Sequence, residues 1–315
     1  MQRDEKRRKV VRVTEDCFAI VVREFLGSPK FAGYAPATQD LWRRYLNFAA
    51  RPNCMGPVPV EDIEPSITQG YIDGLTGFTG VQAATLAALK QLERWAIVRK
   101  KLPRQITLGV EIEESDGGHV PWTNEQVALA EKHARPDIAR AVTLGANTGQ
   151  RGSDLIRMGR SDIETFKGVD GINVVQQKTG REVWVPITPA LASAMATWEK
   201  RPGPFLTRLD GRHWTRPDLT MAWTWERDNN KELAPLKAAG LVLHGLRGHA
   251  CVRLLRANAN TRQISDMVGM SEPMVARYTR FSLQKENASA AVYHMTRTSG
   301  ERDGQKYGKS NDGAA

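Results

Sequence analysis

A break in hydrophobic periodicity between residues 103 and 121 constrains the fold of this 315-residue chain more than any other feature. Within it, the run from Glu111 to Gly118 is acidic and polar and ends in two glycines, so it fits neither a helix nor a strand. A chain of this length holds about two domains. We therefore predict a helical domain over residues 14–102, a linker over 103–121 and a second domain over 122–296.

Two amphipathic helices dominate the pattern of the first domain. One runs from Ala35 to Phe48, where Leu41, Tyr45 and Phe48 repeat at helical spacing. The other covers about residues 81–101 and directs four apolar side chains inward: Leu86, Leu89, Leu92 and Trp95. A solvated helix face explains any single charge on them, but two basic helices in one unit favour contact with DNA. The candidate DNA-binding residues are Arg43, Arg44, Lys90 and Arg94.

The second domain begins with well-marked helices. Thr123 and Gln126 fit a capping box, in which each side chain bonds the backbone of the other residue. Pro136 suits the first turn of the next helix, and Gly149 suits its end. Five more helices are predicted further along: about 189–200, 216–230, 246–257, 261–268 and 272–281.

One β-hairpin interrupts these helices. Apolar and polar residues alternate over 172–177 and again over 182–187, and Lys178 lies in the turn between the two segments. The predicted fold class is therefore mainly α with a small β-sheet, with an all-α N-terminal domain and an α+β C-terminal domain. Outside these domains we predict a basic N-terminal extension over residues 1–13 and a flexible, polar tail over 297–315.

Composition and short motifs exclude several classes of protein. The chain is 41% hydrophobic and has no run of eighteen apolar residues and no secretory signal, so we expect a soluble, cytoplasmic protein. Three widely spaced cysteines predict neither disulfides nor a metal site. Phosphate-binding loops, dinucleotide motifs and His-Glu-x-x-His are absent from the sequence, so we predict no metal and no cofactor. The net charge of +10 favours a polyanionic partner.

Four short segments gather the residues of the second domain that could carry out chemistry. They are Thr148-Gly-Gln-Arg-Gly-Ser-Asp-Leu155 with Ser161-Asp-Ile163 after it, Gln176-Gln-Lys-Thr-Gly180, His244-Gly-Leu-Arg247 and Val275-Ala-Arg-Tyr-Thr279. These segments resemble the signature boxes of the tyrosine recombinases, the phage-integrase family, and they occur in the family's order. Each match is weak alone, but four in order are strong. The resemblance covers about residues 123–295, and the helical region before it is similar to the family's core-binding domain only in pattern.

The resemblance implies a role for each reactive side chain in a reaction on DNA. Tyr278 is the nucleophile that holds the cleaved strand covalently, and His244 is the general base that assists it. Arg151 and Arg247 clamp the phosphate oxygens, because planar guanidinium groups meet two oxygens at once. Lys178, on its flexible hairpin, is the candidate acid that protonates the leaving 5′-oxygen.

Asp154 is a supporting candidate with two open interpretations. It lies three residues after Arg151, so it orients that guanidinium if a helix has begun there. Alternatively, it is an ordinary acidic residue at a helix N-terminus. Without the other boxes, each catalytic candidate also has an ordinary structural explanation: surface ion pairs for the arginine and lysine, a helix cap for the histidine and core packing for the tyrosine.

The sequence departs from the family pattern at two positions. Met270 stands where most relatives carry a histidine or a tryptophan that donates a hydrogen bond to the phosphate, and a thioether donates none. Gly248 stands where a histidine usually follows the second arginine, and the nearest histidine, His249, would point to another side of the helix. Loss of one such donor costs about 2.7–4 kcal/mol, or about 10²–10³ in rate.

Two functions from different classes follow. The first is an active site-specific recombinase or integrase, which cleaves and rejoins DNA through a 3′-phosphotyrosyl intermediate and a Holliday junction. The second is a non-catalytic or impaired DNA-binding homologue that acts as a partner or competitor of an active enzyme. A topoisomerase that uses the same tyrosine chemistry fits the two-domain length and the wording of the boxes less well.

The resemblance also implies partners. We expect duplex DNA at specific recombination sites, gripped by both domains, and a homo-tetramer on two sites, located with the nucleoid. Accessory DNA-bending or directionality proteins are further expected partners. The apolar residues that follow Tyr278 predict one more helix, which packs either on a neighbouring subunit or on its own domain.

Overall fold

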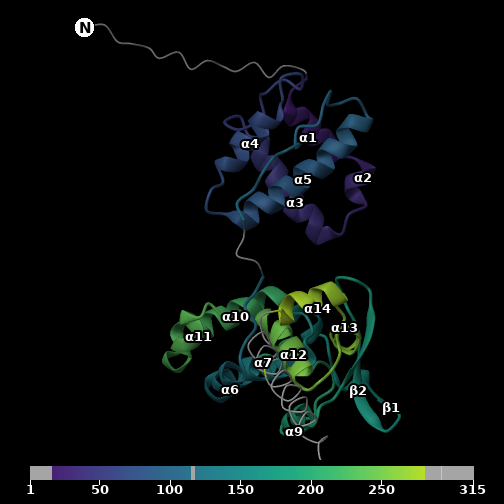
Figure 1. The fold of residues 1–315 in the computed structure, drawn as a ribbon, viewed down its shortest axis with the longest axis vertical. Coiled ribbons are helices and arrows are strands. Elements are labelled where there is room, and N and C mark those ends of the chain that lie inside the picture. The colour runs from purple at the N-terminus through teal and green to yellow at the C-terminus, as the bar shows by residue number, and fades with distance from the viewer. Residues whose placement is uncertain (1–15, 115–117, 281–291, 293–315) are drawn as a thin grey trace, which may run out of the picture. The chain divides into compact units, whose positions relative to one another are not determined.

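The computed structural model describes residues 16–114, 118–280 and 292, and the chain divides into two compact units (Figure 1). The first unit ends at Gly117 and the second begins at Gly118. The predicted N-terminal extension, the tail and the helix after Tyr278 lie outside the described residues. No helix among the residues described has the length and apolar character needed to cross a membrane.

Helices alone build the described part of the first unit. They are α1 (Phe18–Leu26), α2 (Pro29–Ala32), α3 (Pro36–Ala49), α4 (Pro65–Asp73) and α5 (Thr79–Val98). The longest of them, α5, supplies the inward face that its spacing predicts, with Leu89 and Leu92 fully buried and Leu86 and Trp95 nearly so. Because these residues recur every three or four positions, one face of α5 packs against α1 and α3.

The inward face of α3 differs from the prediction. Leu41 and Phe48 are 40% and 43% exposed, whereas Leu46 and Ala49 are fully buried. Both sets repeat at helical spacing, so periodicity alone does not select between the two neighbouring faces. On the outer side, the exposed guanidinium of Arg43 lies over the Phe31 ring at 5.2 Å.

Most of the described residues of the predicted linker over 103–121 are exposed, but the segment is anchored to the first unit near its start. Ile106 is fully buried in the core of the first unit. The buried Glu93 carboxylate accepts hydrogen bonds from the backbone N–H (2.6 Å) and hydroxyl (2.9 Å) of Thr107. Beyond Gly118, Trp122 is buried in the core of the second unit. These buried residues were not predicted, because the segment between the two units was interpreted from its polar, acidic composition.

The second unit opens with two helices whose ends match the sequence signals. Helix α6 (Asn124–His133) begins at the capping box of Thr123 and Gln126, in which both hydrogen bonds are present. Helix α7 (Pro136–Thr148) ends at Gly149, whose φ is +63°. A Cβ at Gly149 would also lie only 2.9 Å from Val268, so glycine is required there for space as well as for conformation.

A three-stranded antiparallel sheet follows, in the order β1-β2-β3. Its strands are β1 (Ile163–Phe166), β2 (Val169–Val175) and β3 (Glu182–Pro186). The predicted hairpin is β2–β3, with Ile172 opposite Val185 and Val174 opposite Val183. These four side chains are buried on one face of the sheet. Strand β1 was not predicted, because its four residues are too few to show alternation.

Helices make up most of the rest of the second unit, and β1 and β2 lie at one side of them in Figure 1. Helices occur at all five ranges predicted after the hairpin, except that the first of them ends earlier, at Ala196. The short helices Gly152–Leu155 and Ala234–Ala238 and the two 3₁₀ turns were not predicted. The predicted fold class, mainly α with a small sheet, is confirmed. The remaining elements are α8 (Gly152–Leu155), η1 (Arg160–Asp162), α9 (Pro189–Ala196), α10 (Arg216–Asn229), η2 (Lys231–Leu233), α11 (Ala234–Ala238), α12 (Gly245–Arg256), α13 (Thr261–Val268) and α14 (Glu272–Thr279).

Candidate active site

All five side chains predicted to be catalytic line one pocket of about 450 Å³ in the second unit, here called the arginine pocket. They come from four elements: Arg151 is at the N-cap position of α8, Lys178 lies in the β2–β3 turn, His244 and Arg247 are at the start of α12, and Tyr278 is near the end of α14. Thr179, Arg181, Gly269, Met270, Ser271 and Met274 complete the lining.

The two arginines place positive charge deep in the arginine pocket. Arg247 is 3% exposed, and its Nη1 donates to the carbonyl of Gly149 at 2.6 Å. Burial, and next the charge of Arg151, lower the pKa of Arg247 to about 10. It remains protonated at pH 7, so two positive charges lie close together in a poorly solvated place. A bound anion would relieve their repulsion, which makes the pocket suited to a phosphate.

His244 is held in its neutral form. Burial lowers its pKa to about 4, and the positive charges of neighbouring groups, including Arg247 and Arg216, add to this effect. The ring of His119 packs edge-on against it, with 4.8 Å between centroids. A neutral imidazole at pH 7 is able to accept a proton. His119 and Arg216 were not predicted to lie near this site, because neither belongs to a signature segment.

Tyr278 packs against the α12 backbone at Gly248. An ideal Cβ at Gly248 would lie 2.9 Å from both Tyr278 Cδ1 and Pro121 Cγ, closer than Cβ atoms normally approach. The tyrosine ring and the proline therefore occupy the space that a side chain at position 248 would need. This close approach is the physical reason for glycine where relatives usually carry histidine.

Met270 lines the arginine pocket without offering a hydrogen-bond donor. Its side chain is 7% exposed, and its Sδ lies 3.9 Å from the Sγ of Cys251, in an apolar cluster that also contacts Tyr278. His249 does not replace it: its Nδ1 is 2.8 Å from the carbonyl of Trp122, and it does not line the pocket.

Asp154 lies in the first turn of α8, which fits the second of its two open interpretations, an acidic residue at a helix N-terminus. Its Oδ1 accepts from the backbone N–H of Gln177 at 2.9 Å, while Arg151 donates instead to the side chain of Gln176. Asp154 is 1% exposed, and its Oδ2 has no hydrogen-bond partner among the residues described. The carboxylate therefore fastens the start of the hairpin turn, and the expected contact with the guanidinium is absent from the described hydrogen bonds and ion pairs.

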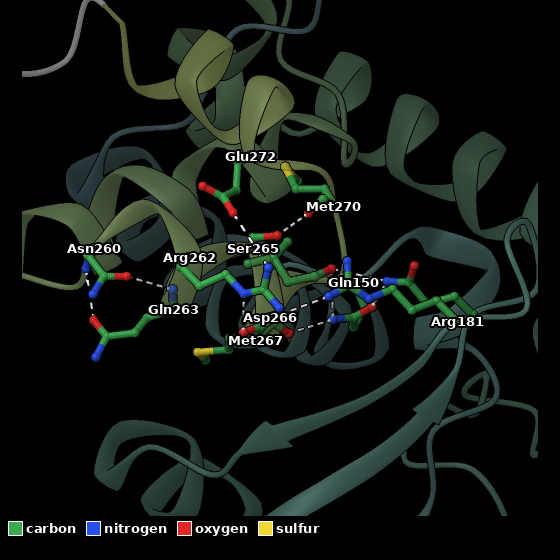
Figure 2. Close-up of polar contacts among 12 residues, drawn as sticks. Gln150, Arg181, Asn260, Arg262, Gln263, Ser265, Asp266, Met267, Met270 and Glu272 are labelled. Atoms are coloured by element: carbon green, nitrogen blue, oxygen red, sulfur yellow. Dashed lines mark hydrogen bonds and ion pairs between the residues drawn. The ribbon is translucent and has the colours of Figure 1, made fainter.

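Arg181 is a pocket residue that the sequence analysis treated only as part of the turn. It forms an ion pair with Asp266 of α13 at 3.0 Å, and Asp266 in turn pairs with Arg262 at 3.0 Å (Figure 2). Arg262 also lies 3.7 Å from Glu272 at the start of α14. These exposed contacts connect the hairpin, α13 and α14.

The residues predicted to bind DNA lie outside the arginine pocket. The candidate DNA-binding residues are exposed on the first unit: Arg43 and Arg44 on α3, and Lys90 and Arg94 on α5. Within the described ranges, no group of three or more His, Cys, Asp or Glu side chains is placed to hold a metal ion.

Comparisons with known proteins agree on one family. The sequence matches the family described as "Phage integrase family" over residues 128–285, half of the chain. A lambda integrase dimer bound to a COC′ core site is similar in structure, with a TM-score of 0.65 and 17% identity, covering 82% of this chain and 76% of that one.

Two further solved structures share the fold. The Tn1549 transposon integrase in complex with circular intermediate DNA has a TM-score of 0.64 at 13% identity, covering 83% of this chain and 94% of that one. The XerH site-specific recombinase bound to palindromic difH substrate has a TM-score of 0.61 at 12% identity, covering 88% and 95%. The search of curated proteins found no match. Because the family model matches half of this chain, the chain belongs to the phage integrase family of tyrosine recombinases.

Proposed function

We propose that this protein is an active site-specific recombinase that cleaves and rejoins DNA through a 3′-phosphotyrosyl intermediate and a Holliday junction. One observation carries the proposal: a single pocket is lined by two arginines, a lysine, a histidine and a tyrosine from four separate segments of the chain. The His244 imidazole in that set is unprotonated at pH 7, since burial lowers its pKa to about 4.

The chemistry follows from these groups. The Tyr278 oxygen attacks the phosphorus, and His244 accepts its proton as the O–P bond forms. Arg151 and Arg247 neutralise the charge that grows on the non-bridging oxygens. The bond from phosphorus to the 5′-oxygen breaks, and Lys178 supplies the proton to that leaving oxygen. Rejoining reverses each step, with the 5′-hydroxyl of a partner strand as the attacking group.

The second candidate is an impaired homologue that binds DNA without cleaving it efficiently. Met270 favours it, because a nearly buried thioether occupies the wall of the pocket and donates nothing to a phosphate. A missing donor costs about 2.7–4 kcal/mol, which slows the reaction by about 10²–10³. Since a slowed enzyme still forms some covalent product, the two candidates differ in whether any Tyr278-dependent product exists.

The DNA partner and the assembly form part of the same proposal. The second unit acts as the catalytic domain, and the first acts as a core-binding domain that grips the duplex with Arg43, Arg44, Lys90 and Arg94. Lambda integrase has been solved as a dimer on a core site and as a tetramer on a Holliday junction. By this likeness we propose a homo-tetramer on two DNA sites, assisted by DNA-bending or directionality proteins.

Covalent trapping tests the activity. A binding sequence is first selected from a pool of randomised duplexes with the Tyr278→Phe protein and is then built into a nicked suicide duplex. We expect the wild type to form a protein–DNA band that resists denaturation, and Tyr278→Phe to form none. If neither protein gives such a band, the active-recombinase function is overturned. Relaxation of supercoiled plasmid that lacks the selected sequence would instead indicate a topoisomerase.

A further inference from the structure

We propose that Gln176 is a positioning residue for Arg151, and that a buried amide pair of Gln176 and Gln150 holds that guanidinium in place without neutralising it. This inference rests on the proposed cleavage reaction. Neither glutamine lines the arginine pocket, so neither would touch the DNA phosphate. Their effect on the reaction would act entirely through the arginine.

Gln176 is fully buried and uses both ends of its amide. Its Oε1 accepts from Arg151 Nη1 at 2.9 Å and from the Thr179 hydroxyl at 3.1 Å. Its Nε2 donates to Gln150 Oε1 at 2.8 Å and to the carbonyl of Val268 at 3.1 Å. One side chain at the end of β2 thus links the first arginine, the lysine turn and the end of α13.

Gln150 fixes which way the Gln176 amide faces. It is 2% exposed, and its Nε2 lies 3.3 Å from the carbonyls of Thr148, Met267 and Val268 (Figure 2). Surrounded by acceptors, Gln150 Nε2 must be the donor, so its Oε1 faces Gln176 Nε2. A reversed Gln176 would put its NH₂ group against the guanidinium and its oxygen against the Val268 carbonyl. The acceptor presented to Arg151 is therefore determined by the network.

The backbone after α13 is shaped to admit this amide. Gly269 has a φ of +67°, and a Cβ there would collide with Gln176 Nε2 and come within 2.7 Å of Val183. The glycine therefore permits the left-handed backbone that ends α13 and leaves room for the Gln176 amide. Because the next residue is Met270 of the pocket wall, the same contact ties Arg151 to the segment that leads into α14 and Tyr278.

A neutral amide suits this place better than a carboxylate. Arg151 already lies close enough to Arg247 to contribute to the low pKa of that group, so an unrestrained Arg151 would turn toward solvent. A carboxylate would hold it but would also cancel the charge that attracts the phosphate. The glutamine oxygen orients the guanidinium and leaves its full charge for the DNA.

Two substitutions and a matched control separate positioning from simple support of the hairpin. Gln176→Met keeps the volume but removes the acceptor and the donor, whereas Gln176→Glu keeps an acceptor and adds a charge. The control, Asp266→Asn, breaks the exposed ion pair with Arg181, which joins the same hairpin to α13 but does not involve Arg151. If Gln176→Met does not fold in a thermal melt, Gln176→Asn, whose amide is shorter by one methylene, takes its place.

The rate of covalent complex formation is measured at saturating suicide duplex, together with the Kd. We expect Gln176→Met to cleave about 10²-fold more slowly than wild type, as for other small misplacements of a reacting group, with little change in Kd. We expect Asp266→Asn to stay close to wild type, because exposed ion pairs contribute little. Gln176→Glu should also cleave slowly, because its arginine is neutralised.

A second duplex carries a methylphosphonate at the cleavage position, which removes the negative charge of one non-bridging oxygen. Since the arginines stabilise that charge, the difference in cleavage rate between Gln176→Met and wild type should be smaller on this duplex. Two results overturn the inference. One is a wild-type cleavage rate for Gln176→Met. The other is a loss of rate in Asp266→Asn that equals the loss in Gln176→Met and persists on the methylphosphonate duplex. If the wild type itself forms no covalent band, the recombinase function fails instead, and NMR of the arginine side chains tests the inference alone. Slow rotation of the Arg151 guanidinium should be seen in wild type and lost in Gln176→Met; its persistence there would refute the positioning role.

Discussion

Replacing Gly248 by alanine is expected to destabilise the second unit and to slow DNA cleavage. In an open helix interior this change stabilises by about 0.5–1 kcal/mol, because glycine loses more conformational freedom on folding. Here the new Cβ would meet Pro121 Cγ and Tyr278 Cδ1, each at 2.9 Å. Both atoms belong to rings, which do not bend away as a flexible side chain does. Overpacking of this kind costs about 1–3 kcal/mol, so the net loss is about 1 kcal/mol.

Thermal unfolding measures the first effect. For a unit of this size, a loss of about 1 kcal/mol lowers Tm by about 2–4 °C. Gly70→Ala in α4 is the matched control, because a Cβ there meets nothing within 4 Å. The control is expected to unfold at the same temperature as wild type or slightly higher.

Covalent trapping measures the second effect, because a ring pushed away from Gly248 carries the nucleophilic oxygen of Tyr278 with it. Gly248→His should lose more than Gly248→Ala in both assays, although histidine is the residue usual in relatives. If Gly248→Ala melts at or above the wild-type temperature and cleaves at the wild-type rate, the close packing of Tyr278 on α12 does not exist in solution.

Three further predictions concern the pocket wall, the base and the DNA surface. Met270→His should raise the cleavage rate by up to about 10²–10³ if a missing donor limits the reaction, and an unchanged rate in the trapping assay would exclude that cause. His244 is neutral in the folded protein down to a pKa of about 4, whereas the unfolded chain takes up a proton near its ordinary value of 6.5. The unfolded state therefore binds more protons between these values, so stability should fall as the pH falls from 6.5 toward 4, and His244→Gln should weaken that dependence in urea titrations; an identical pH profile would contradict the burial of a neutral imidazole. Replacing Lys90 and Arg94 together by alanine should reduce the slope of log Kd against log salt by about 2, measured by fluorescence anisotropy, and an unchanged slope would place the DNA elsewhere.

The elements of the fold were predictable where the signal is local. The capping box of Thr123 and Gln126 and the left-handed Gly149 act through neighbouring residues, so the sequence shows them directly. The inward face of α3 was not predictable, because Leu41 and Leu46 both belong to helically spaced apolar sets. The core of the first unit decides between them.

The candidate site also contains residues that the sequence predicted and residues that it did not. The reactive residues were found because each lies in a recognisable segment, and the structure places all of them on one pocket. Their supports were not found: Gln176 donates directly to Gln150, both donate to the carbonyl of Val268 at the end of α13, and His119 packs on His244 from far away in the chain. Such contacts arise only when distant segments pack. Of the two interpretations left open for Asp154, contact with Arg151 is not seen among the described hydrogen bonds, because the carboxylate accepts from the N–H of Gln177 in the hairpin instead.

The segment from Gly118 to Trp122 has a practical consequence for building chimeric recombinases. Pro121 lies against Gly248 beside the tyrosine, and Trp122 Nε1 donates to the carbonyl of Val242 at 2.9 Å. An engineer who grafts a foreign DNA-recognition module onto this chain should join it ahead of Gly118. A junction placed later would remove Pro121, which packs beside Tyr278, and the hybrid would fail for a reason unrelated to its new target sequence.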